Sequence, residues 1–185
     1  KSEDWLYKMF GIDAELLIDH AWGYETCRMS DIKNYHSEEH SLSNGQVLMR
    51  NYSFEEALVI VREMTDNLIL DLFEKGLVTS SLTLWIAYDH RYEHEASKGT
   101  VKLERESNSS KKIIDAVEDL YLRIADRYIG IRRIEVCANR VAPESYVQYS
   151  LFDDPKQTDK ERHLQEAVLN VKQRYGKNAI MRGSN

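Results

Sequence analysis

The sequence predicts an α+β fold in which two helices cover one face of a four-stranded antiparallel sheet. Four segments between residues 41 and 141 alternate apolar and polar residues, as half-buried strands do. Two further segments repeat apolar residues at helical spacing on one side only, so these helices cannot cover both faces of the sheet. The elements follow the ferredoxin-like βαββαβ order. One sheet face is therefore expected to stay open.

The first strand is predicted at residues 45–52, and the first helix directly after it. Ser53 is a good N-cap residue, and Glu56 three positions later completes a capping-box pattern. Gly76 is expected to end the helix, because glycine readily adopts the left-handed conformation that follows many last turns. The apolar side of this helix is formed by Ala57, Leu58, Val61, Met64, Leu68 and Leu72.

The two middle strands are predicted at residues 78–88 and 99–105, with a charged loop between them. In the first of these strands one face carries Leu82, Leu84 and Ile86, and the other carries Thr83, Trp85 and Ala87. In the second, Val101 and Leu103 face the core, while Thr100, Lys102 and Glu104 face away.

The second helix is predicted from a cap within residues 107–110 to about residue 128, and Gly130 follows its end. The last strand spans residues 131–141. Arg132 and Arg140 have the parity of the core side, so we expect them to reach solvent only from the strand ends or through a bulge. The open face is expected to carry Trp85, Lys102, Glu104, Arg133, Glu135 and Asn139.

Shorter elements flank this domain. Residues 3–20 are predicted as helix in two pieces broken at Gly11, with Gly23 as a C-terminal cap, and the polar residues 26–40 as a linker. A C-terminal helix is predicted with Thr158 and Glu161 as its capping box. Its apolar stripe needs a partner surface, on this chain or another, and consists of Leu164, Val168, Val171 and Tyr175. The predicted division of the chain is 1–25, 26–40, 41–141 and 142–185.

Composition and charge limit the possible functions. The 185 residues include 42% hydrophobic ones, which is enough for a core, and no apolar run is long enough to span a membrane. No secretory signal is present, and two widely spaced cysteines, Cys27 and Cys137, fit a reducing cytoplasm. Because the first residue is Lys1, we expect a piece of a longer protein. The net charge is −6, but residues 41–141 hold 14 basic side chains, so a local basic face is compatible with it.

The sequence contains no recognisable catalytic set. It lacks a glycine-rich phosphate loop and a nucleophile elbow. The pairs His36 and His40, and His90 and His94, have a spacing that suits metal binding on a helix, but both pairs fall in predicted loops. We therefore expect no catalytic residue, no metal ligand and no cofactor in this chain.

Two features are candidates for binding. The open sheet face carries arginine, lysine and asparagine side chains, which can bond phosphate oxygens of a nucleic acid without reading its sequence. The alternatives are a solvated face and a dimer interface. The second candidate is the peptide QYSLF at residues 148–152, whose adjacent Leu151 and Phe152 suit a linear motif that fills a partner's pocket. Alternatively, these two side chains fold back on the domain.

These segments also resemble parts of one family. FGIDAELLIDHAWGYE at residues 10–25 resembles the end of the thumb of a Y-family (translesion) DNA polymerase, and residues 41–141 resemble that family's little-finger domain. QYSLF is similar to the bacterial motif that binds the sliding clamp. Residues 160–183, KERHLQEAVLNVKQRYGKNAIMRG, resemble the C-terminal tail of the Gram-positive polymerases related to the UmuC subunit of DNA polymerase V.

The resemblance implies a non-catalytic module for binding template–primer duplex DNA and the sliding clamp. It implies a bacterial cytoplasm with nucleoid association, a role in translesion synthesis and the SOS response, and Mg²⁺-dependent nucleotidyl transfer by a palm that this chain lacks. The implied phosphate contacts are Ser43, Gln46, Arg50, Lys102, Arg105, Arg132, Arg133 and Arg140. The implied clamp contacts are Gln148, Ser150, Leu151 and Phe152.

Two other readings of the fold remain. An RNA-binding βαββαβ module is disfavoured because the predicted third strand, GTVKLERE, lacks the aromatic side chains on which such sheets stack bases. A domain that dimerises through its sheet is the other.

Overall fold

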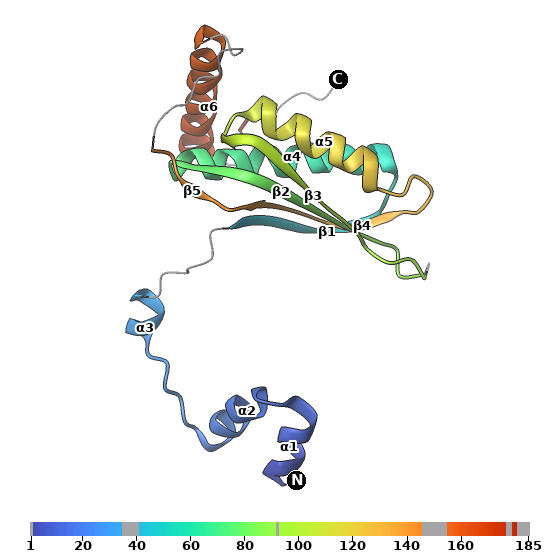
Figure 1. Cartoon of the computed structure of the whole chain (residues 1–185), viewed down its shortest axis with the longest axis vertical. Coiled ribbons are helices and arrows are strands. Elements are labelled where there is room, and N and C mark those ends of the chain that lie inside the picture. Colours follow the sequence, from blue (N-terminus) through green and yellow to red (C-terminus); the bar gives the residue numbers. More distant parts are fainter. Residues whose placement is uncertain (1, 35–40, 92, 146–154, 177–178, 181–185) are drawn as a thin grey trace. The chain divides into compact units, whose positions relative to one another are not determined.

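A computed structural model of the chain describes residues 2–34, 41–91, 93–145, 155–176 and 179–180. The chain divides into two compact units, Lys1–Glu39 and His40–Asn185. The second unit contains the sheet and its helices (Figure 1). No helix among the described residues has the length and apolar character needed to cross a lipid bilayer.

The N-terminal unit contains three short helices: α1 (Glu3–Phe10), α2 (Asp13–Trp22) and α3 (Met29–Asn34). The predicted break at Gly11 and cap at Gly23 are present, and both glycines have a positive φ, 58° and 80°. Helix α3 lies inside the predicted linker. Its start is stabilised locally, because the Asp31 carboxylate accepts a hydrogen bond from the backbone N–H of Arg28 at 2.8 Å.

The main sheet contains β1 (Leu42–Tyr52), β2 (Leu77–Tyr88), β3 (Ser97–Ser107) and β4 (Ile131–Asn139). All neighbouring pairs are antiparallel, in the order β1-β4-β2-β3, so β4 and β2 are the central strands. A two-residue strand, β5 (Ala142–Pro143), pairs with the start of β2. The predicted α+β class with a four-stranded antiparallel sheet is confirmed.

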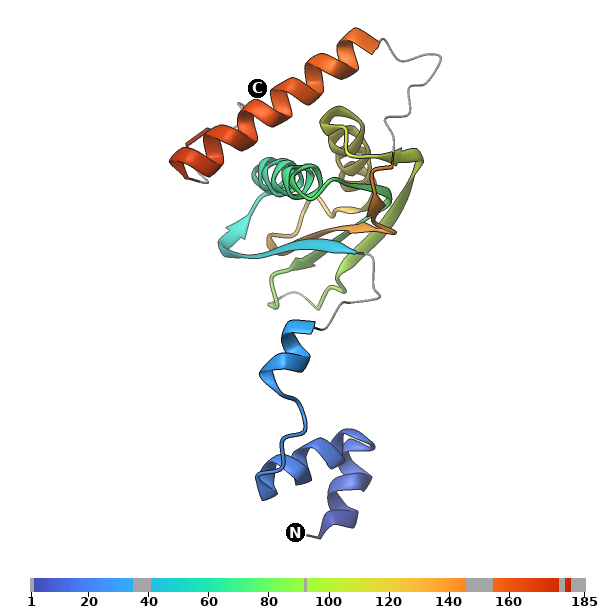
Figure 2. The ribbon, with the colours of Figure 1, turned by 90° about the vertical axis from the view of Figure 1, so that its left-hand side faces the viewer.

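The helices α4 (Phe54–Glu74) and α5 (Ser110–Ile124) lie side by side on one face of the sheet (Figure 2). The predicted capping box of α4 is present, because the Ser53 hydroxyl accepts a hydrogen bond from the Glu56 N–H and the Glu56 carboxylate accepts one from the Ser53 N–H. The core fills the space between helices and sheet. Its largest fully buried side chains include Leu68, Leu72, Leu82, Leu84, Ile86, Ile113, Leu120, Tyr121, Ile131 and Ile134.

Helix α5 ends four residues earlier than predicted. Ala125 is extended rather than helical. The next residue, Asp126, donates its backbone N–H to the Tyr88 hydroxyl at 2.8 Å, and its carboxylate accepts the N–H of Tyr128 at 2.7 Å. The stop is therefore set by a contact with β2, which the local sequence pattern does not reveal.

A bulge near the start of β4 decides which arginine avoids the core. Ala87 pairs with Arg133, but the next residue of β2, Tyr88, pairs with Ile131, so Arg132 is the extra residue. Ile131 and Ile134 are consequently both fully buried. Of the two ways in which Arg132 was expected to reach solvent, a strand-end position or a bulge, the bulge is present.

The C-terminal helix, α6 (Pro155–Tyr175), packs against α4. Its contact side is mainly polar: the Gln165 side chain is buried and donates hydrogen bonds to the Asn108 carbonyl and the Ser110 hydroxyl, both at 2.9 Å. Lys172 reaches the Asn67 side chain at 3.1 Å. The helix therefore docks on its own chain.

The apolar stripe predicted for this helix is only partly covered by the described part of this chain: Leu164 and Tyr175 are 60% and 68% exposed, whereas Val168 and Val171 are half-buried. The predicted capping box is wrong. The helix starts at Pro155, so Thr158 lies inside it rather than at its N-cap. Glu161 does not complete a capping box, because its carboxylate is bound to Ser109 and Lys111.

Candidate nucleic-acid-binding face

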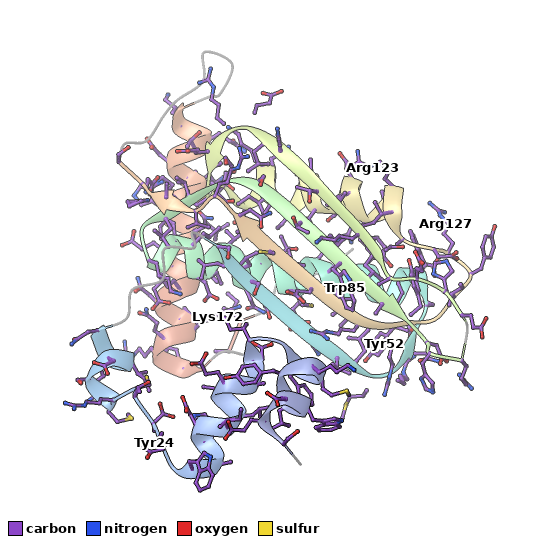
Figure 3. The ribbon with its side chains drawn as sticks, turned by 60° about the horizontal axis from the view of Figure 1, so that its bottom comes forward. Tyr24, Tyr52, Trp85, Arg123, Arg127 and Lys172 are labelled. Carbon is purple, nitrogen blue, oxygen red and sulfur yellow. The ribbon has the colours of Figure 1, made fainter. Side chains whose placement is uncertain are left out.

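The sheet face opposite α4 and α5 is called the open face, since no described element of residues 41–145 or 155–176 covers it. The register places its side chains in four rows across the strands. The rows are Val47, Arg133 and Ala87; Gly45, Glu135, Trp85 and Lys98; Ser43, Cys137, Thr83 and Thr100; and Asn139, Ser81 and Lys102. Trp85 lies near the middle of this face (Figure 3).

The open face is polar and carries three cations, Arg133, Lys98 and Lys102. Between them lies a hydroxyl and amide network, in which Asn139 donates to Thr83 at 2.8 Å and the Thr83 and Thr100 hydroxyls share a hydrogen bond of 2.8 Å. Hydroxyls, amides and cations are the groups that proteins use on phosphate and sugar oxygens. The face therefore matches a sequence-independent contact with a nucleic-acid backbone.

The single cysteine of the open face, Cys137, is poorly suited to nucleophilic chemistry. Burial, followed by the negative charge of Glu135, raises the pKa of its thiol. Because the thiolate is the reactive form, this shift leaves Cys137 as a neutral side chain of the sheet.

Arg133 makes two contacts within the face. Its guanidinium carbon lies 5.1 Å from the centre of the Trp85 ring. Its Nη2 atom lies 3.6 Å from Oε2 of Glu135, which is an ion pair without hydrogen-bond length. The Arg133 side chain is still 50% exposed.

The structure brings Ser43, Lys102 and Arg133 of the predicted DNA contacts together on the open face. Gln46 does not join them: it pairs with Ile134, so it has the parity of the helix-covered face of the edge strand β1. Arg50 is bound at the N-terminus of α4, where it donates hydrogen bonds to both carboxylate oxygens of Glu56. These bonds, before any other cause, raise the pKa of Arg50.

The remaining predicted contacts lie at strand irregularities. Arg105 is exposed in β3, between Lys102 and Ser107, where the regular pairing with β2 is interrupted. Arg132 is the bulge residue of β4 and is half-buried. Arg140 follows the end of β4, is exposed, and has a φ of 50°, in the left-handed region that few non-glycine residues adopt.

Sequence reasoning missed Lys98 as a candidate, because the third strand was predicted to start at residue 99. The structure starts β3 at Ser97, and Lys98 then pairs directly with Trp85. Extending the alternation of Thr100 and Lys102 by one step toward the N-terminus would have found it.

The predicted clamp contacts, Gln148, Ser150, Leu151 and Phe152, lie outside the described residues. The described chain before them is fixed at Glu144. Its backbone N–H donates to the Gly76 carbonyl at 2.8 Å, and its carboxylate accepts hydrogen bonds from Arg162 and Asn108.

Within the described ranges, no group of three or more His, Cys, Asp or Glu side chains is arranged to hold a metal ion. His94 forms an ion pair with Asp126 at 3.4 Å and contacts the Tyr88 ring edge-on. His90 lies 3.6 Å from the Asp89 carboxylate.

The sequence of the domain that carries the open face matches a known family. Residues 39–151 match the C-terminal domain of the impB/mucB/samB family, which is more than half of the chain. The chain belongs to the impB/mucB/samB family. The matched part of the chain contains the whole sheet, α4 and α5, and it ends within the sequence QYSLF. Helix α6 lies beyond the match.

Three solved structures are similar to this member of the impB/mucB/samB family. "Complex of beta-clamp processivity factor and little finger domain of PolIV" is 12% identical, with a TM-score of 0.43, and covers 62% of this chain and 100% of its own. "Post-insertion binary complex of Dbh DNA polymerase" is 15% identical, with a TM-score of 0.41; the match covers 77% of this chain and 40% of that polymerase chain. "Y-family DNA polymerase chimera Dbh-Dpo4(243-245)-Dbh" is 17% identical, with a TM-score of 0.43; the match covers 77% of this chain and 39% of the chimera.

The chain thus spans about two fifths of the length of the two polymerase structures. No curated protein sequence matches it significantly.

Proposed function

We propose that this chain is the little-finger domain and flanking segments of a bacterial Y-family, UmuC-like translesion DNA polymerase of the Gram-positive type. In this proposal residues 1–25 are the end of the thumb and 26–40 the linker. The chain is a non-catalytic DNA-binding and clamp-binding module. The catalytic palm, with the Mg²⁺ ions that its carboxylates hold, belongs to other parts of the enzyme, which acts in the cytoplasm at the nucleoid during the SOS response.

The observation that carries the DNA part of the proposal is the open face, which joins Arg133, Lys98 and Lys102 with a row of hydroxyl groups. These groups bond phosphates without distinguishing base pairs, as a polymerase that moves along its template requires. The acidic side chains of the unit are mostly elsewhere. The helices α4 and α5 carry nine of the 16 acidic residues in the stretch 41–141, on the opposite side of the sheet.

The DNA part is tested by titrating a fluorescently labelled primer–template duplex with the chain at several salt concentrations. Affinity should fall steeply with salt, and Arg133→Ala should weaken binding and reduce the slope of log K against log salt by about one. Arg123→Ala is the matched control, because Arg123 projects from α5 on the helix side (Figure 3). A binding curve insensitive to salt, or equal losses for both variants, contradicts the proposal.

The clamp part of the proposal assigns residues 148–152 as the peptide that fills a pocket on the sliding clamp. Gln148 would provide a polar anchor, Ser150 a spacer contact, and Leu151 and Phe152 the apolar groups. Support comes from the sequence pattern and from the fixed position of Glu144 just before the peptide. Short peptides of this kind bind through a few buried apolar anchors.

Clamp binding is tested with purified clamp and the full chain by calorimetry. The double variant Leu151→Ala with Phe152→Ala should abolish measurable binding. Leu164→Ala is the matched control, since Leu164 is an exposed apolar residue of α6. Clamp affinity that survives in the double variant contradicts this part of the proposal and leaves the DNA part intact.

A further inference from the structure

The contacts of Arg133 on the open face follow from the sizes of its neighbours. Ala87 pairs with Arg133, and its small side chain leaves the long arginine room to lean toward Trp85, the next residue of β2 on the same face. Gly45 pairs with Glu135 from the other side. A Cβ atom at Gly45 would lie 3.6 Å from Cγ of Glu135, so the glutamate side chain extends over β1.

The two contacts use different parts of the guanidinium group. The centre of the Trp85 ring lies 5.1 Å from its central carbon, within the range of cation–π attraction. A cation–π contact of this kind does not use up the N–H groups of a guanidinium, and these can bond a phosphate through two parallel hydrogen bonds. Glu135 instead approaches one of the terminal nitrogens, Nη2, at 3.6 Å, where a phosphate oxygen would bind.

The ion pair between Glu135 and Arg133 is weak. The distance is longer than a hydrogen bond, and the side chains of Arg133 and Glu135 are 50% and 37% exposed. Exposed ion pairs of this kind are worth no more than about one power of ten in an equilibrium constant and are screened by salt.

We propose that Trp85 is a positioning residue that holds Arg133 ready for an anionic backbone, and that Glu135 is an intramolecular competitor which a DNA phosphate displaces. This inference deepens the proposed function and rests on it, because the displaced carboxylate matters only if the open face binds DNA. The built-in competitor lowers affinity and leaves the arginine oriented. It gives a weak, readily reversed contact on a protein that must release and rebind its duplex.

The competitor is tested with Glu135→Gln in the full chain, by titration of a labelled primer–template duplex at low salt. Binding should tighten by about two- to fivefold, the range expected for release from one exposed ion pair. Glu104→Gln is the matched control, since it makes the same charge change at an exposed residue of β3 that has no ion-pair partner among the described residues. Glu104→Gln should gain less DNA affinity than Glu135→Gln. The gain in affinity of Glu135→Gln should disappear when Arg133 is also replaced by Ala.

Three results overturn the inference in distinguishable ways. If the wild-type chain binds no duplex even at low salt, the proposed function fails and the inference fails with it. If the wild type binds but Glu135→Gln gains no more than Glu104→Gln, only the competitor role fails. If the gain persists without Arg133, Glu135 acts through general charge alone.

The positioning role is tested separately with Trp85→Ala and Trp85→Phe. The alanine variant should weaken DNA binding several-fold, and the phenylalanine variant should restore most of it, because a phenyl ring also attracts a cation. A readout without DNA uses the full chain with Trp5 and Trp22 replaced by Phe, where Arg133→Ala should make the Trp85 fluorescence more accessible to acrylamide. Equal binding by all three Trp85 forms, or unchanged quenching, overturns the positioning role.

Discussion

The carboxylate of Glu161 in α6 accepts a hydrogen bond from the backbone N–H of Lys111 at 3.0 Å, in the first turn of α5. It also accepts the hydroxyl proton of Ser109, the N-cap residue of that helix, at 3.0 Å. One helix thus places a negative charge at the positive end of another, where unpaired N–H groups and the helix dipole favour it.

Replacing Glu161 with Ala should lower the free energy of unfolding by about 1–2 kcal/mol, the size of a lost helix cap. Hydrogen exchange of α6 should also accelerate, since this contact joins α6 to the domain. Glu166→Ala is the control, because Glu166 is an exposed residue of the same helix. Equal losses for the two variants, measured by urea denaturation, would contradict the capping role.

Acid should destabilise the domain through Glu56. The hydrogen bonds from Arg50, and after them the N–H of Ser53, lower the pKa of this carboxyl from 4.5 to about 2. Because the folded state holds the proton less tightly than the unfolded chain, the contribution of Glu56 is present above pH 4.5 and is lost as pH falls toward about 2. Glu56→Gln should flatten stability against pH in that window, whereas the exposed neighbour variant Glu55→Gln should leave the slope in place.

High pH should destabilise the domain through Tyr121. Burial raises the pKa of its phenol above the usual 10.0, and the hydroxyl donates to the Phe54 carbonyl at 2.8 Å. The folded state therefore binds this proton more tightly, so stability should decline as pH rises above 10.0. Tyr121→Phe should remove that decline and lower stability at neutral pH by about 1 kcal/mol, the net value of a typical hydrogen bond. A tyrosinate absorbance titration that shows Tyr121 ionising in the folded state would contradict this expectation.

Two glycines should respond differently to alanine. A Cβ atom at Gly130 would lie 2.9 Å from Cβ of Asn51, which cannot move without its backbone. At Gly99 the nearest atom, at 2.8 Å, is the terminal Cδ1 of Leu120, which can rotate away. Overpacking of this kind typically costs about 1–3 kcal/mol. In thermal unfolding, the loss of stability should lie at the upper end of this range for Gly130→Ala and at the lower end for Gly99→Ala. The reverse order would be inconsistent with this geometry.

The sequence was sufficient for the existence and the two faces of the strands, though not for their exact ends, and for the first helix, because these features depend on local residue patterns. The alternation of Leu82, Leu84 and Ile86 with Thr83 and Trp85 predicts both faces of β2 correctly. The capping box at Ser53 is likewise local, since both of its hydrogen bonds join residues three positions apart.

Features that depend on contacts between residues far apart in the chain could not be predicted from local sequence patterns. The early end of α5 depends on the Tyr88 hydroxyl, and the docking face of α6 depends on Gln165, a polar residue that no apolar stripe includes. In the candidate site, parity placed Arg133 correctly. Gln46 was assigned as a phosphate contact from a family resemblance and not from the alternation in its own strand, where it pairs with Ile134 on the helix-covered side. That contact stays a prediction.

The contact between Glu161 and Ser109 also sets an order of assembly during synthesis. Ser109 leaves the ribosome 52 residues before its carboxylate partner. A nascent chain can therefore contain all four long strands, α4 and α5 while the N-terminus of α5 still lacks Glu161 and the Ser110 hydroxyl still lacks Gln165. The contacts of α6 can therefore form only after the elements of the sheet, α4 and α5 have been synthesised, and a ribosome that stops before residue 161 releases a domain whose second helix begins without its partner charge.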